Sequence, residues 1–467
     1  MKFKIIFLMF LFSLKGFSQD SLKTLNADQL MNIVRTYHPI VKQADIRIER
    51  SVAELLMARG AFEPVLSNNS GQKTFDNLNY YTYSATEIKI PTWFGIELSG
   101  GIEDLSGSKF DPTETLGKTN YLGVTVPLVK NLLVDKRRAT LKQAKIYTTM
   151  AEIEKRAVVN DLLMQAIESY YAWVKSSQTL VVVQNNLLTS KKRADLMSRS
   201  FFNGEKSAID TLEAYTQYQS FQLLQQNKEL DFNNASLSLS SFLWKNENEP
   251  TVLPKDVVPQ VNWENELKMD SFTIVLDDLL SFSSSSNPNI QLYSYKLSGL
   301  EIDQKLKFQE LLPKVDFKYN SLSKSYDFAK NIGGHSVFDN NFLYGVKVEM
   351  PLLLAKGRAE YKISKLKIAD TRIDQTQKIV FNALKIKGYF NEYETLKSQI
   401  ALQAQIYSNY RKLVEAEEKR FENGESSLFL INSRENKALE SQEKLIELKT
   451  KYYKSIFALQ WISGKLL

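Results

Sequence analysis

The sequence predicts a mainly α-helical fold with a β-barrel segment, in which a duplicated strand pair is followed each time by long antiparallel coiled-coil helices. Three observations predict this fold class. Landmark residues recur in the same order in the two halves, two very long runs contain almost no proline or glycine, and segments of alternating apolar and polar residues precede each run.

Residues 1–18 have the pattern of a secretory signal peptide. Lys2 and Lys4 give a positive start, and Ile5–Leu14 is a short apolar core. About ten apolar residues are too few for a membrane anchor. The net charge of the whole chain is +7, which does not predict nucleic-acid binding. The chain contains no cysteine, which excludes disulfides, thiolate metal sites and a lipid-modified N-terminus.

An internal duplication organises the rest of the chain. Pro64 lies 249 residues before Pro313, and the same spacing separates Pro39 from Pro288. Later landmarks keep their order at shorter spacings; they are Pro127 and Pro351, Gly204 and Gly424, and Trp244 and Trp461. The spacing shortens after Pro64, so we expect an extra hairpin around Pro91–Gly107. We place the first repeat at 19–250, a linker at 251–273 and the second repeat at 274–467.

Alternating apolar and polar residues predict strands at about 64–127 in the first repeat and at about 313–351 in the second. The alternating segments are Thr86–Ile90, Ile96–Ser99, Tyr121–Val126, Val315–Tyr319 and Tyr344–Met350. Alternation with many tyrosines suits strands between lipid and water, although a small soluble sheet is the alternative. Loops are expected at Asp76–Asn79, Lys109–Lys118 and Tyr326–Asn341. A few strands cannot close a barrel alone, so a membrane location requires several copies to pool their strands.

The proline-free runs predict two helical hairpins, at about 128–245 and about 352–463. Leu128–Asn203 contains neither proline nor glycine, and Arg358–Asn423 contains only Gly388. Each run could form a helix of roughly 100 Å. Apolar residues repeat every seven positions in three series, which are Leu366, Ile373 and Val380; Leu223, Leu230, Leu237 and Trp244; and Ala438, Leu445, Tyr452 and Leu459. This spacing predicts packing against long neighbouring helices. Gly204 and Gly424 are expected to reverse the chain at two equivalent tips.

Taken together, these features resemble the TolC-like outer membrane efflux protein family, the outer membrane factors. The residues that carry the resemblance from about Leu25 to Gly464 are Arg199–Gly204, Lys419–Gly424, Arg137–Ala139 and Gly357–Ala359. The resemblance implies a homotrimer that forms an α/β-barrel duct, with its barrel in the outer membrane of a Gram-negative bacterium and its helical part in the periplasm. It implies a periplasmic adaptor (membrane fusion) protein and an inner-membrane pump as partners, no cofactor, and passive export in tripartite efflux or type I secretion.

The resemblance also implies two sets of site residues. Those at the tips, expected to bind the adaptor, are Phe201, Asn203, Gly204, Glu205, Phe421, Asn423, Gly424 and Glu425. Those expected to line the gate and pore are Asp195, Asp210, Glu213, Leu430 and Ser433. Phe421 and Ser426 stand where the family has a tyrosine and an arginine, and Leu430 and Ser433 replace two aspartates. The polar lock of the family is therefore largely absent.

Asp210 and Glu213 suggest a substitute for the lost acidic rings. They lie three positions apart on one helical face just after the first tip. In a trimer they would form a ring of carboxylates that favours cations. The alternative is an ordinary helix start, where acidic residues interact well with the helix dipole.

No catalytic constellation is present, and we expect no enzyme, metal site or cofactor. Gly117–Thr119 resembles the end of a phosphate loop but has Pro112 where the earlier glycine is required, and His38 and His335 have no metal-ligand spacing. The main alternative function is a soluble periplasmic coiled-coil scaffold or adaptor protein. Such a protein would share the signal peptide and long helices, but it would not need paired alternating strands in both halves.

Overall fold

The structure, a computed structural model, describes residues 24–109, 111, 114–245, 249–254, 256–260, 274–324, 326 and 340–466. The predicted signal peptide at 1–18 and most of the predicted loop at 326–341 lie outside these residues. The chain divides into two compact units. Unit 1 is built from residues up to His38, Leu163–Ile274 and Asn391–Phe457. Unit 2 is built from Pro39–Leu162, Val275–Phe390 and Ala458–Leu467.

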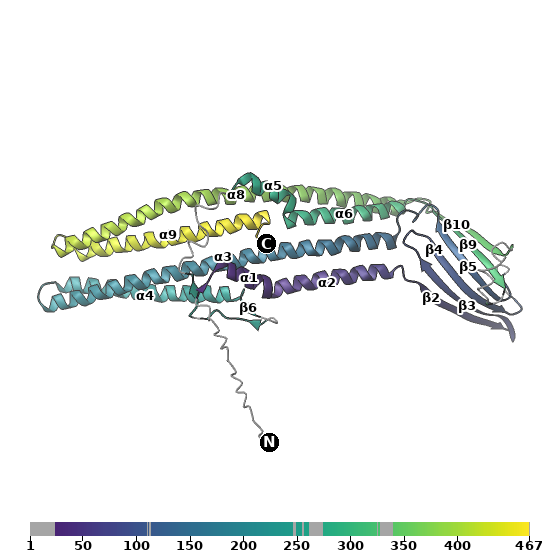
Figure 1. Cartoon of the computed structure of the whole chain (residues 1–467), viewed down its shortest axis with the longest axis horizontal. Coiled ribbons are helices and arrows are strands. Elements are labelled where there is room, and N and C mark those ends of the chain that lie inside the picture. Colours follow the sequence, from purple (N-terminus) through teal and green to yellow (C-terminus); the bar gives the residue numbers. More distant parts are fainter. Residues whose placement is uncertain are drawn as a thin grey trace, which may run out of the picture. The chain divides into compact units, whose positions relative to one another are not determined.

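Helices account for most of the described chain (Figure 1). They are α1 (Ala27–Tyr37), α2 (Pro39–Gly60), α3 (Lys136–Phe202), α4 (Ala208–Ser240), α5 (Leu276–Ser286), α6 (Pro288–Gln309), α8 (Ala355–Glu422) and α9 (Leu428–Ser463). Helices α3 and α8 have 67 and 68 residues, and each contributes residues to both units. At 1.5 Å per residue each helix is about 100 Å long, which confirms the predicted long helices.

The two long helices begin later than the sequence predicts. Helix α3 starts at Lys136 instead of about 128, because the preceding residues continue the sheet contacts: the Leu128 amide donates to the Val315 carbonyl at 2.7 Å. The chain then turns through Asn131, which has a left-handed backbone with φ 68°. The Asp135 carboxylate accepts the Arg138 amide at 2.8 Å and so caps the new helix.

In the second repeat, α8 starts at Ala355 instead of about 352, directly after Leu354, whose φ of 49° is also left-handed. Helix α4 ends at Ser240, before the expected limit of 245, and α9 ends at Ser463. Side-chain amides satisfy the carbonyls at this last helix end: Asn160 donates to the Trp461 carbonyl at 2.9 Å, and Asn287 donates to the Ile462 carbonyl at 2.8 Å.

Unit 2 contains one antiparallel sheet of six strands in the order β10-β9-β5-β4-β3-β2 (Figure 1). The strands are β2 (Val65–Phe75), β3 (Leu78–Pro91), β4 (Glu97–Ser106), β5 (Gly117–Pro127), β9 (Lys314–Lys324) and β10 (Phe342–Glu349). Four strands come from the first repeat and two from the second. The two additional strands, β3 and β4, form a hairpin over Leu78–Ser106, so the extra hairpin begins earlier than the predicted Pro91–Gly107. The first repeat joins the second through the β5–β9 pair.

Two short pairs of strands lie outside the six-stranded sheet in the described part of the chain. In unit 1, β1 (Thr24–Leu25) pairs in parallel with β8 (Val258–Pro259), so part of the expected linker at 251–273 is structured. Strand β6 (Trp244–Lys245) pairs with β7 (Glu249–Pro250). Most of the linker, residues 261–273, lies outside the described residues.

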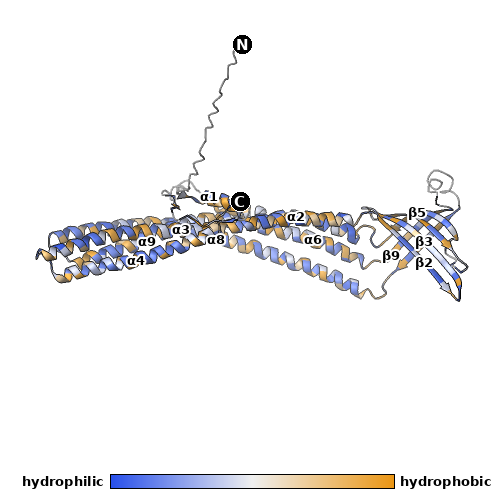
Figure 2. Cartoon of the chain, turned by 90° about the horizontal axis from the view of Figure 1, so that it is seen from below, coloured by the Kyte–Doolittle hydropathy of each residue, from blue (hydrophilic) through white to orange (hydrophobic). Residues whose placement is uncertain are grey.

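The six-stranded sheet has one apolar face and one charged face. Apolar and polar residues alternate along its strands (Figure 2). The register places one apolar set on a common face: Ile88, Ile90, Leu98, Ile102, Leu122, Val124, Val126, Val315, Phe317, Tyr319, Phe342, Tyr344, Val346 and Val348. The opposite face carries Glu87, Lys89, Glu97, Glu103, Lys314, Asp316, Lys318, Lys347 and Glu349. A sheet with a packed face shielded by its own chain would bury the first set, yet most of these residues are exposed or half-exposed.

An aromatic cluster in unit 1 holds α3, α4, α8 and α9 together. Trp173 of α3 is fully buried and stacks on Phe232 of α4, with ring centroids 6.5 Å apart. Tyr393 of α8 stacks on Tyr452 of α9 at 5.3 Å. Tyr453, also of α9, completes the cluster by stacking on Tyr171 of α3 at 6.1 Å. Large buried rings of this kind contribute heavily to packing, so the middle of the helical hairpins is the core of this unit.

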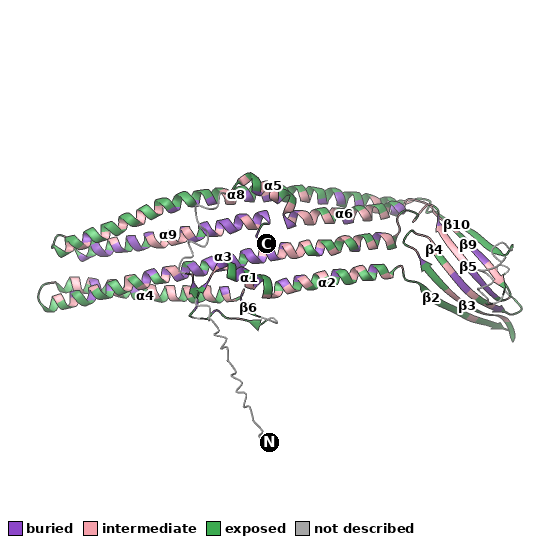
Figure 3. Ribbon diagram, in the orientation of Figure 1, coloured by how far each residue is buried: buried purple, intermediate pink, exposed green. Residues whose placement is uncertain are grey.

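Only one of the three seven-residue series is buried. In α9, Ala438, Tyr452 and Leu459 are buried and Leu445 is half-buried. In α4 and α8 the series are exposed over half or more of each side chain, between 51% and 67%; they are Leu223, Leu230, Leu237, Leu366, Ile373 and Val380. Figure 3 shows these two helices exposed along much of their length. The same spacing therefore serves packing within the chain in one helix and leaves an uncovered apolar face in two others.

Among the described helices, none combines the length and the apolar content that crossing a membrane would require.

Candidate functional site

The two hairpin turns of unit 1 have the same backbone. In the first, the Gly204 amide donates to the Phe201 carbonyl at 2.9 Å, and the Glu205 amide donates to the Ser200 carbonyl at 2.8 Å. In the second, the Gly424 amide donates to the Phe421 carbonyl at 3.0 Å, and the Glu425 amide donates to the Arg420 carbonyl at 2.8 Å. This paired pattern is the Schellman end of a helix, which needs a left-handed residue. Both glycines supply it, with φ of 76° and 78°.

The side chains at the two turns differ in exposure. Phe202 is 83% exposed, and Phe201, Asn203 and Glu205 are also exposed. In the second turn Asn423 and Glu425 are exposed, but Phe421 is half-buried. The next turn of each following helix adds the exposed apolar residues Ile209, Leu212 and Phe429. The first tip therefore presents the larger exposed apolar surface.

A small core joins the two tips. Met197 of α3, Ala214 of α4 and Leu428 of α9 are buried in one cluster, against which Phe421 of α8 packs. The Lys206 ammonium, which follows the first tip, lies 4.4 Å from the centre of the Phe421 ring. A cation over an aromatic face is favourable. The aromatic residue that replaces the tyrosine of the family thus contacts the neighbouring hairpin of its own chain.

Asp210 caps helix α4. Its carboxylate accepts the Ser207 amide at 3.2 Å and the Ser207 hydroxyl at 2.7 Å, while the Ser207 hydroxyl accepts the Asp210 amide. This is a capping box, which stabilises a helix start. The Glu213 carboxylate accepts a hydrogen bond from the side-chain amide of Asn432 in α9 at 3.4 Å. Asp195 is exposed on α3. Asp210 and Glu213, the two residues of the predicted acidic ring, therefore also have structural partners within the chain.

The replaced gate positions lie at the start of α9. Leu430 and Ser433 are exposed, one helical turn apart. Ser426 donates its hydroxyl proton to the Glu417 carboxylate at 2.6 Å. The same carboxylate lies 3.6 Å from Arg420 and 3.9 Å from Arg434. The position that holds an arginine in the family is thus bound to an acidic residue of the preceding helix.

The sequence analysis missed the most buried ionic contact near the tips. The Arg193 guanidinium of α3 donates to both carboxylate oxygens of Glu435 in α9, each at 2.6 Å, and to Glu418 of α8 at 3.1 Å. The side chains of Arg193 and Glu435 are only 13% and 10% exposed. Burial acts to lower the pKa of Arg193, but the hydrogen bonds and charges of Glu435 and Glu418 outweigh it and raise that pKa. One cation therefore joins three helices.

One sequence signal could have located this contact. Leu428, Ile431, Ala438 and Leu439 form the buried stripe at the start of α9, and Glu435 occupies the position between them at helical spacing. A carboxylate within an apolar stripe requires a cation partner, since a buried unpaired charge is very unfavourable. The sequence does not identify Arg193 as that partner, because the match depends on how α3 and α9 are aligned.

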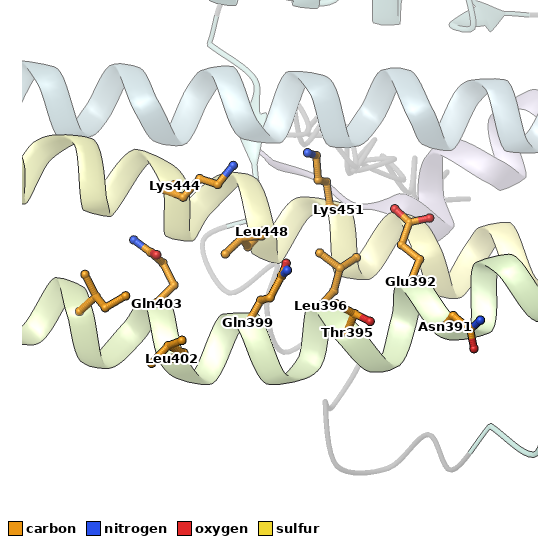
Figure 4. A pocket seen from close by; sticks show the side chains of 11 residues that line it. Asn391, Glu392, Thr395, Leu396, Gln399, Leu402, Gln403, Lys444, Leu448 and Lys451 are labelled. Carbon is orange, nitrogen blue, oxygen red and sulfur yellow. The ribbon is translucent and has the colours of Figure 1, made fainter.

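A groove of about 580 Å³ runs between α8 and α9 in unit 1. Its labelled side chains come from both helices, with Leu396 and Leu402 on one side and Leu448 on the other (Figure 4). Lys444 and Lys451 border it, and both bind Glu447, at 3.2 Å and 2.6 Å. The hydrogen bond from Lys451, assisted by Lys444, lowers the pKa of Glu447 to about 2. No cluster of metal-binding side chains occurs among the described residues.

Comparison with solved structures identifies the fold. The outer-membrane channel OprN matches with a TM-score of 0.67 at 13% identity, over 94% of this chain and 90% of that chain. The CmeC outer membrane channel of Campylobacter jejuni matches with a TM-score of 0.66 at 13% identity, over 95% and 86%. The outer membrane protein VceC of Vibrio cholerae matches with a TM-score of 0.64 at 14% identity, over 94% and 96%.

The fold is that of the TolC-like outer-membrane channels. The expected fold class is thereby confirmed, and each of these matches covers nearly the whole described chain. The neighbours of this TolC-like fold are channel proteins. Neither a protein-family model nor a curated protein sequence matches the chain.

Proposed function

We propose that this chain is one protomer of a homotrimeric export duct, which carries substrates passively from the periplasm to the exterior. In this proposal the six-stranded sheet contributes to a barrel in the outer membrane, and the helices form the periplasmic part. The duct performs no chemistry of its own and serves a tripartite efflux or type I secretion system, in which an inner-membrane pump provides the driving force.

The two faces of the sheet are the observation that carries the proposal. One face is exposed and lined by residues such as Val124, Phe317 and Val348, whereas the other carries glutamates and lysines. Water would disfavour so extended an apolar face on a soluble protein, while lipid would stabilise it. The charged face then suits a water-filled lumen. Similarity in fold to outer-membrane channels supports the same assignment.

The exposed series on α4 and α8 support assembly into a homotrimer. Leu223, Leu230 and Leu237 form one such series, and Ile373 belongs to the other. Long helices need lateral neighbours, and seven-residue series are the pattern by which such helices pack. Neighbouring copies of the chain would cover both series.

Assembly and location are tested together in the source bacterium. We expect the protein in the detergent-extracted outer membrane, where unheated samples should migrate as trimers and heated samples as monomers. A soluble periplasmic monomer would instead support the alternative, a coiled-coil scaffold or adaptor.

The tips are proposed to bind a periplasmic adaptor protein, because Phe202 and its neighbours form an exposed apolar surface at a turn. A photo-cross-linking side chain at position 202 should capture the adaptor, whereas the same group at position 223 should capture a second copy of this chain. Capture of the same product from both positions would contradict this assignment of surfaces.

A further inference from the structure

The sheet ends in two edges that have no strand partner among the described residues, β2 on one side and β10 on the other. Both edge strands are exposed along almost their whole length. An exposed edge carries unpaired amide and carbonyl groups, which are very unfavourable in lipid. If the chain is a barrel protomer, as proposed above, each edge must pair with another strand.

The duplication indicates how the edges pair. Strand β5 is the last strand of the first repeat, and β10 is the last strand of the second, with Pro127 equivalent to Pro351. Strand β2 begins the first repeat as β9 begins the second, with Pro64 equivalent to Pro313. The β5–β9 pair within the chain is therefore the equivalent of a β10–β2 pair between chains. In β5–β9 the strands are antiparallel, and Val124 lies opposite Tyr319.

We propose that β10 of one copy pairs antiparallel with β2 of the next copy, with Val348 opposite Ser70 and Val346 opposite Gln72. These pairs are the equivalents, in the duplicated sequence, of Val124 with Tyr319 and Leu122 with Ser321. The inference rests on the proposed barrel function but adds to it the partner strand and the register.

The faces of the strands support this register independently. Val346 and Val348 lie on the apolar face of the sheet, opposite Phe317 and Val315 of β9. Leu66, Ser70 and Gln72 of β2 lie on the same face, because Leu66 is opposite Ile88. A shift by one residue would place the apolar face of one copy beside the charged face of the next. The register taken from the duplication therefore keeps the apolar face continuous from one copy to the next.

The strand number of the barrel follows from the same pairing. Three copies of a six-stranded sheet close into a barrel of eighteen strands, in which every edge is paired. Barrels of 16–18 strands enclose a water-filled channel, whereas those of about eight strands are filled by side chains. The β3–β4 hairpin therefore widens the lumen in this chain.

Cysteine cross-linking tests the register in the full-length protein in outer membranes, and the absence of native cysteine gives a clean background. The double variant Val348→Cys with Ser70→Cys should form covalent trimers with a short bis-maleimide, since directly opposite side chains have Cβ atoms about 5 Å apart. The control Val348→Cys with Leu66→Cys keeps both cysteines on the apolar face but moves one by four positions, about 13 Å, and should stay largely monomeric.

The outcomes separate the register from the function. Trimers that an amine-reactive cross-linker detects, but that the first pair fails to link, would overturn the register and leave the trimer in place. Equal linking of both pairs would do the same. A covalent series that stops at dimers or extends beyond trimers would overturn the eighteen strands, and the absence of any oligomer would overturn the proposed function itself.

Discussion

Replacing Arg193 with methionine removes the guanidinium that joins α3 to α8 and α9, and leaves the Glu435 carboxylate without its cation. Glu435 is only 10% exposed, so water does little to replace the lost hydrogen bonds. Removing one partner of a buried ion pair costs about 3–5 kcal/mol. We expect Arg193→Met to lower the free energy of unfolding of the helical part by about this amount.

Two further variants divide this loss between its causes. Glu418 is 41% exposed, so Glu418→Gln should cost less than about 1 kcal/mol. The double variant Arg193→Met with Glu435→Leu leaves no buried unpaired charge, since Glu418 is 41% exposed, and restores apolar packing, so it should recover most of the stability. The difference between the double variant and the sum of the single variants measures the coupling of the pair.

Urea unfolding of the detergent-solubilised protein, followed by circular dichroism at 222 nm, gives the required free energies because helices dominate that signal. A loss below about 1 kcal/mol for Arg193→Met would refute the view that this contact holds the tips together. A double variant as unstable as Arg193→Met would show that packing, rather than the unpaired carboxylate, causes the loss.

Three further predictions follow from single positions. Because folding lowers the pKa of Glu447 from 4.5 to about 2, the ionised carboxylate stabilises the fold above pH 4.5, and this stabilisation is lost as the pH falls towards 2. Thermal unfolding should show that the free energy of unfolding falls by at most about 3 kcal/mol over that range. The variant Glu447→Gln should lack this loss. Neutralising Asp210 and Glu213 together should reduce the cation selectivity of single channels, and unchanged selectivity would reject the acidic ring. Gly204→Ala should destabilise the protein by about 1 kcal/mol, because position 204 has a left-handed φ of 76°. Gly388→Ala should stabilise it by a similar amount, because position 388 lies within α8 with open space around it. Chemical denaturation of the two variants in parallel tests whether their changes in unfolding free energy have opposite signs.

Proline and glycine positions made much of the fold predictable. Gly204 and Gly424 end helices where the sequence predicts, because a left-handed residue stops a helix whatever surrounds it. The changed spacing between the two repeats likewise indicated an extra hairpin, although β3 begins at Leu78, before the predicted start at Pro91. The starts of α3 and α8 were predicted too early, since Asn131 and Leu354 adopt left-handed conformations. Asparagine tolerates this conformation without requiring it, and leucine rarely adopts it.

Contacts between helices were less predictable. Leu223 and Tyr452 belong to series with the same spacing, yet the first is exposed and the second is buried. Periodicity identifies an apolar face but not what covers it. The pairing of Arg193 with Glu435 depends on the relative alignment of α3 and α9, to which no local pattern is sensitive. The site residues taken from the family resemblance stay predictions, apart from their positions in the turns.

The two repeats join strand to helix by different physical means. In the first, the Arg138 guanidinium binds Asp135 at 2.8 Å and the carbonyls of Asn131 and Leu132 at 2.5 Å and 3.0 Å. In the second, Gly357 lets the backbone approach so closely that an added Cβ would lie 2.8 Å from the Glu310 carbonyl oxygen. The first joint depends on a charged side chain that is only 13% exposed and is therefore little screened by salt, whereas the second depends on the absence of a side chain. A substitution can therefore weaken the first joint by removing atoms and the second by adding them.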